Sequence, residues 1–226
     1  MAHLLERPIW SALTSRHAAL AEGNALARRY PRDVSAFAAT ADETAESLAA
    51  LALLAPPGDT LLLVQKDPIV LPPGFEVVTR ATLVQMVADT AVAEVDDMRV
   101  HPLGRADAAD MLALAQLTKP GPFSLRAQDF GPFWGIRHGG RLIAMAGQRL
   151  GQDGFRELSG VCTHPDAQGQ GLGRLMSLFG TRQIQAAGDT AYLHAYAINT
   201  PAIRLYEAIG FRLRETMNMA IIRKGE

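Results

Sequence analysis

The chain has 226 residues, 48% of them hydrophobic, and a formal net charge of -1, so it can bury one large core or two small ones. The near-neutral charge without a basic block argues against nucleic-acid binding, and the one cysteine excludes an internal disulfide framework and fits a reducing compartment. Residues 1–10 carry no signal-like apolar run and no stretch reaches the ~18 apolar residues of a membrane span, which predicts a cytoplasmic location without a membrane partner.

Residues 1–95 are predicted to form a smaller α/β half. The predicted elements are a mostly helical, Ala-rich segment over 4–30, a helix from a capping box at Thr40–Glu43 to Leu54, strands over 60–65 and 75–79, and a short helix over 83–87. Two Pro-Pro-Gly runs separate these elements, and an acidic cluster of Glu94, Asp96 and Asp97 marks the boundary near residue 95.

Residues 96–226 carry denser signals. The predicted elements are strands over 98–102, 133–137, 141–150, 155–163 and 191–197, helices over 106–117, 171–187 and 201–209, and a final strand or strand pair over 211–223. Met111, Leu114 and Leu117 are expected on one apolar face of the first of these helices. A hairpin followed by a β-α-β-α-β order predicts an α/β (α+β) fold, with a mixed sheet flanked by helices.

The most informative motif is a glycine-dense turn between a predicted strand and a predicted helix, Gln168-Gly169-Gln170-Gly171-Leu172-Gly173-Arg174. Backbone N–H groups and the partial positive charge of a helix N-terminus suit such a turn to binding an anion. The dinucleotide-binding fingerprint Gly-x-Gly-x-x-Gly/Ala does not match, because Arg174 or Met176 stands where its last Gly or Ala is required. The Gly-Lys-Ser/Thr run of a Walker loop is also missing. What remains is Gln-x-x-Gly-x-Gly, or a glycine-rich connection without a ligand.

Together with its two flanks, this turn resembles the signature of the GNAT superfamily of acyl-CoA-dependent N-acetyltransferases. Upstream, the strand ends in Val161-Cys162-Thr163-His164-Pro165, like the Val-x-x-x-Pro of the family. Downstream, Asn199 precedes a small-residue helix and the run Tyr206-Glu207-Ala208-Ile209-Gly210-Phe211, like the family's Tyr-x-x-x-Gly-Phe. The resemblance covers residues 98–224. Residues 1–95 lack all of these motifs, so the resemblance implies a degenerate half that does not bind CoA.

The resemblance implies acetyl-CoA as co-substrate and no metal. The turn would hold the pyrophosphate, because backbone N–H groups approach it closely where side chains are absent, and the main chain of the preceding strand would bind the pantetheine arm. The implied cofactor-binding residues are Val161, Cys162, Thr163, Gln168, Gly169, Gln170, Gly171, Leu172, Gly173, Arg174 and Asn199. His164 and His194 have no third residue at metal-ligand spacing.

Acetyl transfer to an amine needs a base for the ammonium proton and an acid for the departing thiolate. The resemblance implies Glu157 as the base and Tyr206 as the acid. The alternatives are a surface ion pair of Glu157 with Arg149 or Arg156, and core packing of Tyr206.

The strand before the turn raises two further questions. Strand alternation places Glu157, Ser159, Val161 and Thr163 on one face, unless a bulge intervenes. Cys162, with His164 two residues on, could be a nucleophile, but a small buried hydrophobe is the favoured interpretation because direct transfer needs no covalent enzyme step.

The sequence therefore predicts direct transfer of an acetyl group to a primary amine in a ternary complex. The acceptor, a small molecule or a peptide amine, would contact the loop over 119–132, where several aromatic side chains could line a pocket or pack in the core: Phe123, Phe130, Phe133 and Trp134. A non-catalytic acyl-CoA-binding regulatory module, or an acyltransferase with another acyl group or acceptor, remains the alternative. Packing, acceptor selection and dimerisation are open roles for residues 1–95.

Overall fold

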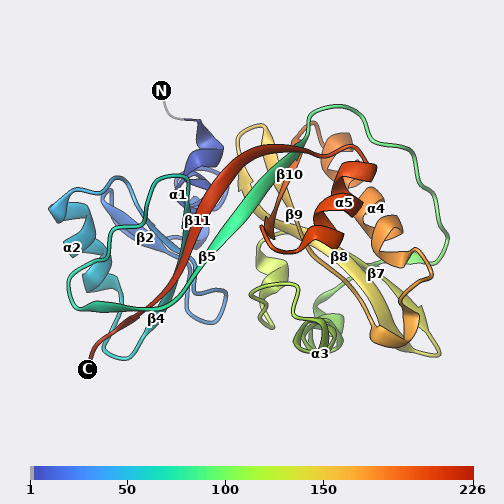
Figure 1. Cartoon of the computed structure of the whole chain (residues 1–226). Helices are drawn as coiled ribbons and strands as arrows, with labels where there is room; N and C mark the ends of the chain where they lie inside the picture. The colour runs from blue at the N-terminus through green and yellow to red at the C-terminus, as the bar shows by residue number, and fades with distance from the viewer. Residues whose placement is uncertain (1–2) are drawn as a thin grey trace. The chain divides into compact units, whose positions relative to one another are not determined.

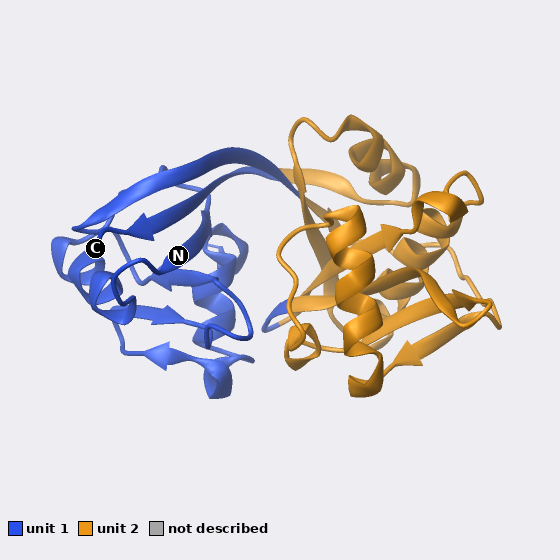
Figure 2. Cartoon of the chain, turned by 90° about the horizontal axis from the view of Figure 1, so that it is seen from below, with its two compact units in different colours: residues 1–85, 150–153, 215–226 blue, residues 86–149, 154–214 orange. Residues whose placement is uncertain are grey.

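The computed structural model describes residues 3–226, which divide into two compact units (Figure 2). Unit 1 takes in the residues up to Gln85 together with 150–153 and 215–226, and unit 2 takes in 86–149 and 154–214. Residue 95, the predicted boundary, lies within unit 2. That residues 1–95 are a degenerate copy of the second half stays a prediction.

Unit 1 contains a three-stranded antiparallel sheet, β1-β2-β3, and strands of a larger sheet. Its elements are η1 (Leu4–Glu6), α1 (Pro8–Leu13), η2 (Ala18–Leu20), β1 (Glu22–Gly23), β2 (Ala27–Arg29), β3 (Ala38–Thr40), α2 (Ala45–Leu54), β4 (Thr60–Gln65) and most of β5 (Phe75–Ala88). The α2 helix packs its Leu51 against Leu61 of β4 and small side chains of β2 and β3, Ala27 and Ala38, in one buried cluster. These small side chains let α2 lie close to the three-stranded sheet.

Unit 2 contains the strands and helices that flank the glycine-dense turn. Its elements are β6 (Val100–Leu103), η3 (Arg105–Asp107), α3 (Ala108–Thr118), η4 (Ala127–Asp129), β7 (Phe133–His138), most of β8 (Arg141–Gln152), β9 (Phe155–Thr163), η5 (Pro165–Ala167), α4 (Leu172–Ala186), β10 (Thr190–Tyr196), α5 (Thr200–Ala208) and the start of β11 (Arg212–Lys224). Gly139 and Gly140, both with positive φ, make the tight turn between β7 and β8 that the sequence predicts.

The larger sheet has the strand order β4-β11-β5-β10-β9-β8-β7-β6 (Figure 1). β9 and β10 run parallel, whereas β6 and β7, β7 and β8, and β4 and β11 pair antiparallel. The predicted mixed sheet flanked by helices is therefore confirmed. The strands β5, β8 and β11 each begin in one unit and end in the other.

Helices α3 and α4 cover opposite faces of β8 and β9. In β8, Met145 belongs to a buried cluster with Met111 and Leu114 of α3. The next residue, Ala146, faces Gly180 of α4 instead. Adjacent residues of a strand point to opposite faces, so the sheet separates the two helices.

A bulge at Gly160 changes which residues of β9 share a face. Gly160 has φ +63°, a backbone conformation that favours glycine, in the middle of the strand. Before it, Leu158 lies against Gly180 of α4; after it, Thr163 lies near Gly173 of α4 and Cys162 joins the α3 cluster. The uninterrupted alternation that would put Thr163 and Glu157 on one face is therefore wrong: Glu157 and Cys162 share the α3 face.

Two predicted elements of unit 1 are wrong. Residues 4–30 are not mostly helical; α1 has six residues, and the rest is short 3₁₀ turns and strands that are held by tertiary contacts such as Arg28 Nη1 donating to Leu13 O at 2.6 Å. Residues 83–87 are part of β5 and not a helix. There the side chain of Gln85 is buried and donates to Leu5 O at 2.9 Å, and Met86 and Val87 are buried on the two faces of the strand.

Two helix details also differ. The N-cap of α2 is Thr44, which accepts from Ser47 N at 3.3 Å, and not Thr40; Glu43, the expected capping-box partner, instead pairs with Arg7. In α3, Met111 and Leu114 are buried but Leu117 is 53% exposed. At 100° per residue, Leu117 lies about 120° around the helix from Met111, outside the stripe that faces the core.

Candidate functional site

The glycine-dense turn leads into the N-terminus of α4, a helix of 15 residues. Gly171 is its N-cap, with φ +74°, and Gly169 has φ +76°, so both positions require the left-handed conformation that favours glycine. A Cβ built on either would meet no atom within 4 Å. Both glycines are exposed, so open space lies beside the turn, and an anion can approach the backbone there.

A buried hydroxyl at the end of β9 indicates that this space suits a polar ligand. The Oγ1 of Thr163 is buried and has no hydrogen-bond partner among the described residues. It would lie 3.7 Å from a Cβ on Gly173, which makes it a neighbour of the α4 N-terminus. Buried polar groups are normally hydrogen-bonded, so a phosphate oxygen or another polar group of a ligand would complete the site. The residues present thus fit the pyrophosphate of acetyl-CoA.

Three arginines line a cavity beside the turn. The cavity, of about 290 Å³, contains Arg99, Arg137 and Arg141 in its wall together with Gln170 and Leu172 of the turn. Each arginine is partly neutralised: Arg99 pairs with Asp97 at 2.6 Å, Arg137 with Asp107 at 2.6 Å and Asp110 at 2.7 Å, and Arg141 with Asp166 at 3.1 Å. These pairs leave the cavity polar but not strongly cationic.

The strands β9 and β10 form the centre of unit 2. Their parallel pairing covers Thr190–Tyr192 and Phe155–Glu157, the first residues of each strand. The pairing ends with Tyr192 opposite Glu157, and the segments that follow lead to the glycine-dense turn on one side and to Asn199 on the other. Glu157 therefore lies at the last paired position between the two strands.

Glu157 is the centre of a buried polar network built by three neighbouring strands. Its side chain is 0% exposed, and Arg149 of β8 donates to both of its carboxylate oxygens, at 2.8 and 2.7 Å. Nδ1 of His194, on β10, lies 2.8 Å from Oε1 of the same carboxylate. The ion pair with Arg149 that the sequence raised as an alternative is thus present, but it is buried and not at the surface.

The network keeps the Glu157 carboxyl ionised. Burial alone would raise its pKa, but the charge of Arg149 and the hydrogen bonds from Arg149 and His194 outweigh burial and hold the pKa well below its ordinary value. A carboxylate held in this way is a weak proton acceptor near neutral pH. The role of Glu157 as the base stays a prediction, and the contacts favour a role in which it acts on another residue.

Tyr206 and Cys162 both keep their protons near neutral pH. Burial, with a smaller electrostatic contribution from Cys162, raises the pKa of Tyr206 to about 12. Burial raises the pKa of the Cys162 thiol to about 11, against a smaller opposing hydrogen bond with Thr118. The half-buried Tyr206 can therefore donate a proton, whereas Cys162, buried in the α3 cluster, has little thiolate to act as a nucleophile.

The loop over 119–132 approaches this network from the α3 side. A Cβ on Gly121 would lie 3.9 Å from Nη1 of Arg149, and Phe130 O accepts from Arg156 Nη1 at 3.3 Å. Of the loop aromatics, Phe130 and Phe133 are buried, and Phe123 packs edge-on against Phe133 with centroids 5.5 Å apart. Trp134 lies instead against Phe179 of α4, on the other side of the sheet.

The remaining predicted binding residues lie at the surface of the same region. Gln168, Gln170 and Arg174 are exposed. Asn199 is exposed and caps α5, where its Oδ1 accepts from Ala202 N at 3.3 Å. Their contact with a cofactor stays a prediction. His194, by contrast, carries no sequence signal for a role in this site, because its place on β10, two residues beyond the strand pairing, is visible only once the strands are aligned.

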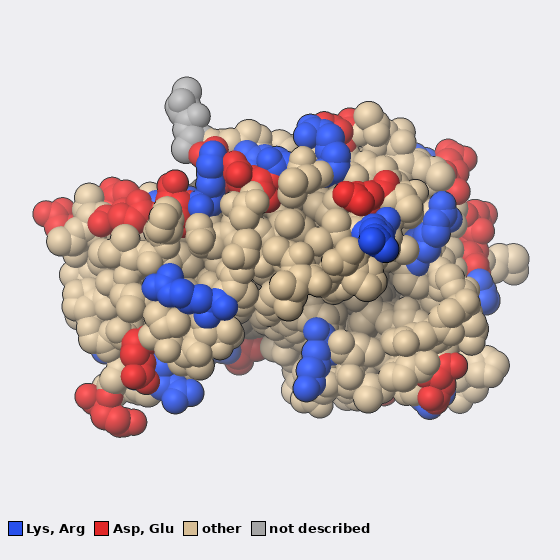
Figure 3. All heavy atoms as spheres, viewed as in Figure 1, with Lys and Arg blue, Asp and Glu red and all other residues tan. Residues whose placement is uncertain are grey.

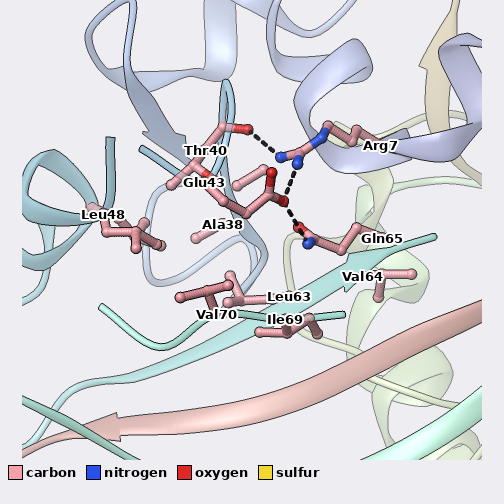
Figure 4. Close-up of a pocket in the computed structure, with 12 residues that line it drawn as sticks. Arg7, Ala38, Thr40, Glu43, Leu48, Leu63, Val64, Gln65, Ile69 and Val70 are labelled. Carbon is pink, nitrogen blue, oxygen red and sulfur yellow. Dashed lines mark hydrogen bonds and ion pairs between the residues drawn. The ribbon is translucent and has the colours of Figure 1, made fainter. Parts of the chain in front are cut away.

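Unit 1 offers no comparable site in its described cavity. The residues in Figure 4 surround about 10 Å³ of free space, room for one water molecule at most. The Arg7 guanidinium points to Thr40 O and to the Glu43 carboxylate, which also accepts from Gln65 Nε2 at 2.9 Å. These contacts fill the cavity with a structural ion pair.

Charge and metal-ligand groups point to no further site in the described residues. On the face in Figure 3, Lys and Arg side chains are interspersed with Asp and Glu. Residues 3–226 contain no group of three or more His, Cys, Asp or Glu side chains placed to hold a metal ion. In the same range, no helix is long and apolar enough to cross a bilayer.

Known proteins resemble both the sequence and the fold. The FR47-like protein family matches residues 133–220. A mycothiol acetyltransferase from Thermomonospora curvata is 40% identical over 73 residues, which are 32% of this chain and 25% of that protein. The chain thus spans about a quarter of the length of this curated relative.

Two solved structures extend over the whole chain. A GCN5-related N-acetyltransferase from Kribbella flavida has a TM-score of 0.62 at 19% identity, covering 96% of this chain and 93% of its own, and shares the fold. A protein from Novosphingobium aromaticivorans DSM 12444, described as an acetyltransferase of the GNAT family, has a TM-score of 0.93 at 38% identity and covers 100% of both chains. The turn, the strand before it and this end-to-end match agree, and the chain belongs to the GNAT family of acetyltransferases.

Proposed function

We propose that this protein transfers an acetyl group from acetyl-CoA directly to a primary amine, with both substrates bound at once. The observation that carries the proposal is the α4 N-terminus, where two exposed, left-handed glycines border open space and the buried, unpartnered Thr163 hydroxyl lies beside Gly173. Acetyl-CoA supplies an activated acetyl thioester. The turn residues 168–174 would hold its pyrophosphate, and the main chain at 161–163 would hold its pantetheine arm.

The residues of unit 2 would move the protons. As the ammonium becomes an amide it loses two protons, the new C–N bond forms and the thioester C–S bond breaks. Tyr206 is proposed to protonate the departing sulfur, which fits a phenol whose pKa is about 12 and which is therefore protonated at any working pH. One amine proton replaces the one that Tyr206 gives up, and the other leaves through a base in the Glu157 network.

The acceptor is proposed to be a small molecule or a peptide amine that reaches the α3 side of the sheet, under the loop over 119–132. Asn199 is proposed to contact the cofactor arm, and Gln168, Gln170 and Arg174 its phosphates. The reaction would take place in the cytoplasm, with no nucleic-acid or membrane partner.

The binding half of the proposal is tested by calorimetry and thermal shift with acetyl-CoA. A ligand that binds the native state raises its apparent stability, so a rise in Tm is expected, and no rise at millimolar acetyl-CoA would contradict the proposal. The catalytic half is tested by release of free thiol with a panel of amines, which includes peptide N-termini, small amines and the acceptor of a mycothiol acetyltransferase.

A non-catalytic acyl-CoA-binding module is the competing function. It predicts acetyl-CoA binding without thiol release for any amine, and binding that Tyr206→Phe leaves intact. The enzyme predicts thiol release that Tyr206→Phe lowers. An acyltransferase for another acyl group or an O-linked acceptor would show in the same assay as a preference for that donor or acceptor.

A further inference from the structure

We propose that His194 is the base of this reaction, and that Glu157 and Arg149 are positioning residues that hold its ring and fix its tautomer. This inference rests on the proposed function, and it assigns the amine proton to His194 and not to Glu157. It is carried by the geometry of the network that the strands β8, β9 and β10 build.

The three members of the network differ in their ability to accept a proton. Arg149 stays protonated at all working pH values and has no acceptor. Glu157 is 0% exposed, with its two oxygens engaged by Arg149 and His194. The His194 side chain is 6% exposed, and its ring has a second nitrogen, Nε2, beyond the Nδ1 that faces Glu157. Of the three, His194 is therefore the member that can take a proton from a substrate.

The hydrogen bond between His194 and Glu157 determines which nitrogen carries the proton. An ionised carboxylate only accepts hydrogen bonds, so Nδ1, at 2.8 Å from Oε1, must be the donor. The neutral ring then has its lone pair on Nε2. When Nε2 takes a proton from the amine, the imidazolium charge arises next to the carboxylate, which stabilises it. The proton passes from the ammonium nitrogen to Nε2 and then to solvent.

The surroundings support this orientation. Tyr192, on the same face of β10, packs edge-on against the His194 ring with centroids 5.7 Å apart. Arg149 fixes the Glu157 carboxylate with two hydrogen bonds, so the oxygen that accepts from Nδ1 cannot rotate away. The groups that contact His194 include Tyr192 on its own strand and Glu157 on β9, which in turn pairs with Arg149 on β8. Cys162 lies on the same face of β9.

The matched test compares His194→Asn with wild type in the thiol-release assay. The Asn amide nitrogen can replace Nδ1 as the donor to Glu157, but Asn cannot take up a proton. General-base catalysis contributes 10²–10⁴-fold, so we expect kcat to fall about 100-fold or more with the affinity for acetyl-CoA unchanged by calorimetry. The acidic limb of the wild-type pH profile, where the base becomes protonated, should disappear. His101→Asn, an exposed histidine on β6, is the control and should leave both unchanged.

A second variant separates positioning from folding. Glu157→Gln presents an amide that can donate as well as accept, so the tautomer of His194 is no longer fixed. We expect a lower kcat, a displaced acidic limb and an intact Tm response to acetyl-CoA. In ¹⁵N NMR spectra of the imidazole rings, the wild-type signal that His194→Asn removes should be that of an Nδ1–H tautomer, and Glu157→Gln should change it.

Several outcomes would overturn the inference. A kcat within threefold of wild type for His194→Asn, or an acidic limb that survives in it, would show that another group takes the proton. An Nε2–H tautomer in the wild-type spectra would refute the positioning role even if no amine in the panel were acetylated. Absence of thiol release by the wild type, with the Nδ1–H tautomer present, would instead contradict the proposed function and with it the assignment of a base.

Discussion

Replacement of Arg149 by Met tests whether Glu157 is a buried carboxylate that depends on a single cation. The Arg149 side chain is 16% exposed and that of Glu157 is 0% exposed, so little water can replace the lost guanidinium. Removal of one partner of a buried ion pair typically costs about 3–5 kcal/mol, which is a large part of the ~5–15 kcal/mol that stabilises a domain. We expect Arg149→Met to lower the free energy of unfolding by about that amount.

The pH dependence of the same variant should reverse in sign. In the wild type the folded-state pKa of Glu157 lies well below its ordinary value of 4.5, so the unfolded state binds more protons and stability from this group is lost as the pH falls below that value. Without Arg149, burial becomes the largest influence and raises the pKa. The folded state then binds the extra proton, and stability from this group is lost as the pH rises.

The assay is urea unfolding followed by tryptophan fluorescence, at about pH 4 and about pH 8. Arg149→Met/Glu157→Leu, which removes both charges, should recover much of the loss at the higher pH. Arg182→Met is the matched control, because the Arg182–Glu94 pair is 34% and 88% exposed and should be worth less than about 1 kcal/mol. A loss of under about 1 kcal/mol for Arg149→Met, with an unchanged pH dependence, would show that water or another group already solvates Glu157.

Three further predictions concern the cofactor site and the chemistry. Gly173→Ala should keep or raise Tm, since its Cβ meets Thr163 Oγ1 at an ordinary 3.7 Å and Ala favours the helix. The same variant should weaken acetyl-CoA binding in calorimetry, and an unchanged affinity would argue against a close approach of the cofactor to Gly173. Tyr206→Phe should lower kcat about 10²-fold or more at constant acetyl-CoA affinity, and equal rates would contradict the role of Tyr206 as the acid. Because the pKa of Tyr206 is about 12, any fall in the wild-type rate at a pH well below 12 comes from another group and should also occur in Tyr206→Phe. Cys162→Ala should retain thiol release, and native Cys162 should resist iodoacetamide at pH 8 because burial raises its pKa to about 11; loss of activity together with rapid labelling would revive the nucleophile.

The second half of the fold was largely predictable because its signals are local. The strand at 155–163 matches β9 at both ends, and the helix expected from Gly171 begins at Leu172, with Gly171 as its cap. Turn glycines and an apolar stripe act within a few residues, so a pattern can reveal them. Residues 4–30 and 83–87 were mispredicted because distant contacts override their local preference. The Gln85 amide, for example, bonds to a carbonyl 80 positions away.

The residues of the candidate site also differ in whether local sequence signals or distant contacts place them. The anion-binding turn is continuous in sequence, so its residues could be named in advance. The Arg149–Glu157–His194 network draws on three strands, and nothing in the spacing of these residues predicts that their side chains meet. The Gly160 bulge adds a change of face that alternation alone does not foresee.

The strand β11 gives the two units an order of completion during synthesis. Residues 218–223 of β11 pair with β4, and these residues leave the ribosome after every residue of unit 2. Unit 1 therefore begins first but cannot close its sheet until the last segment arrives, while β4 waits with an unpaired edge. At residue 214 the chain thus holds every residue of unit 2 but lacks the last segment of unit 1. A chain truncated after residue 214 and released from the ribosome should contain a protease-resistant unit 2 and an open unit 1.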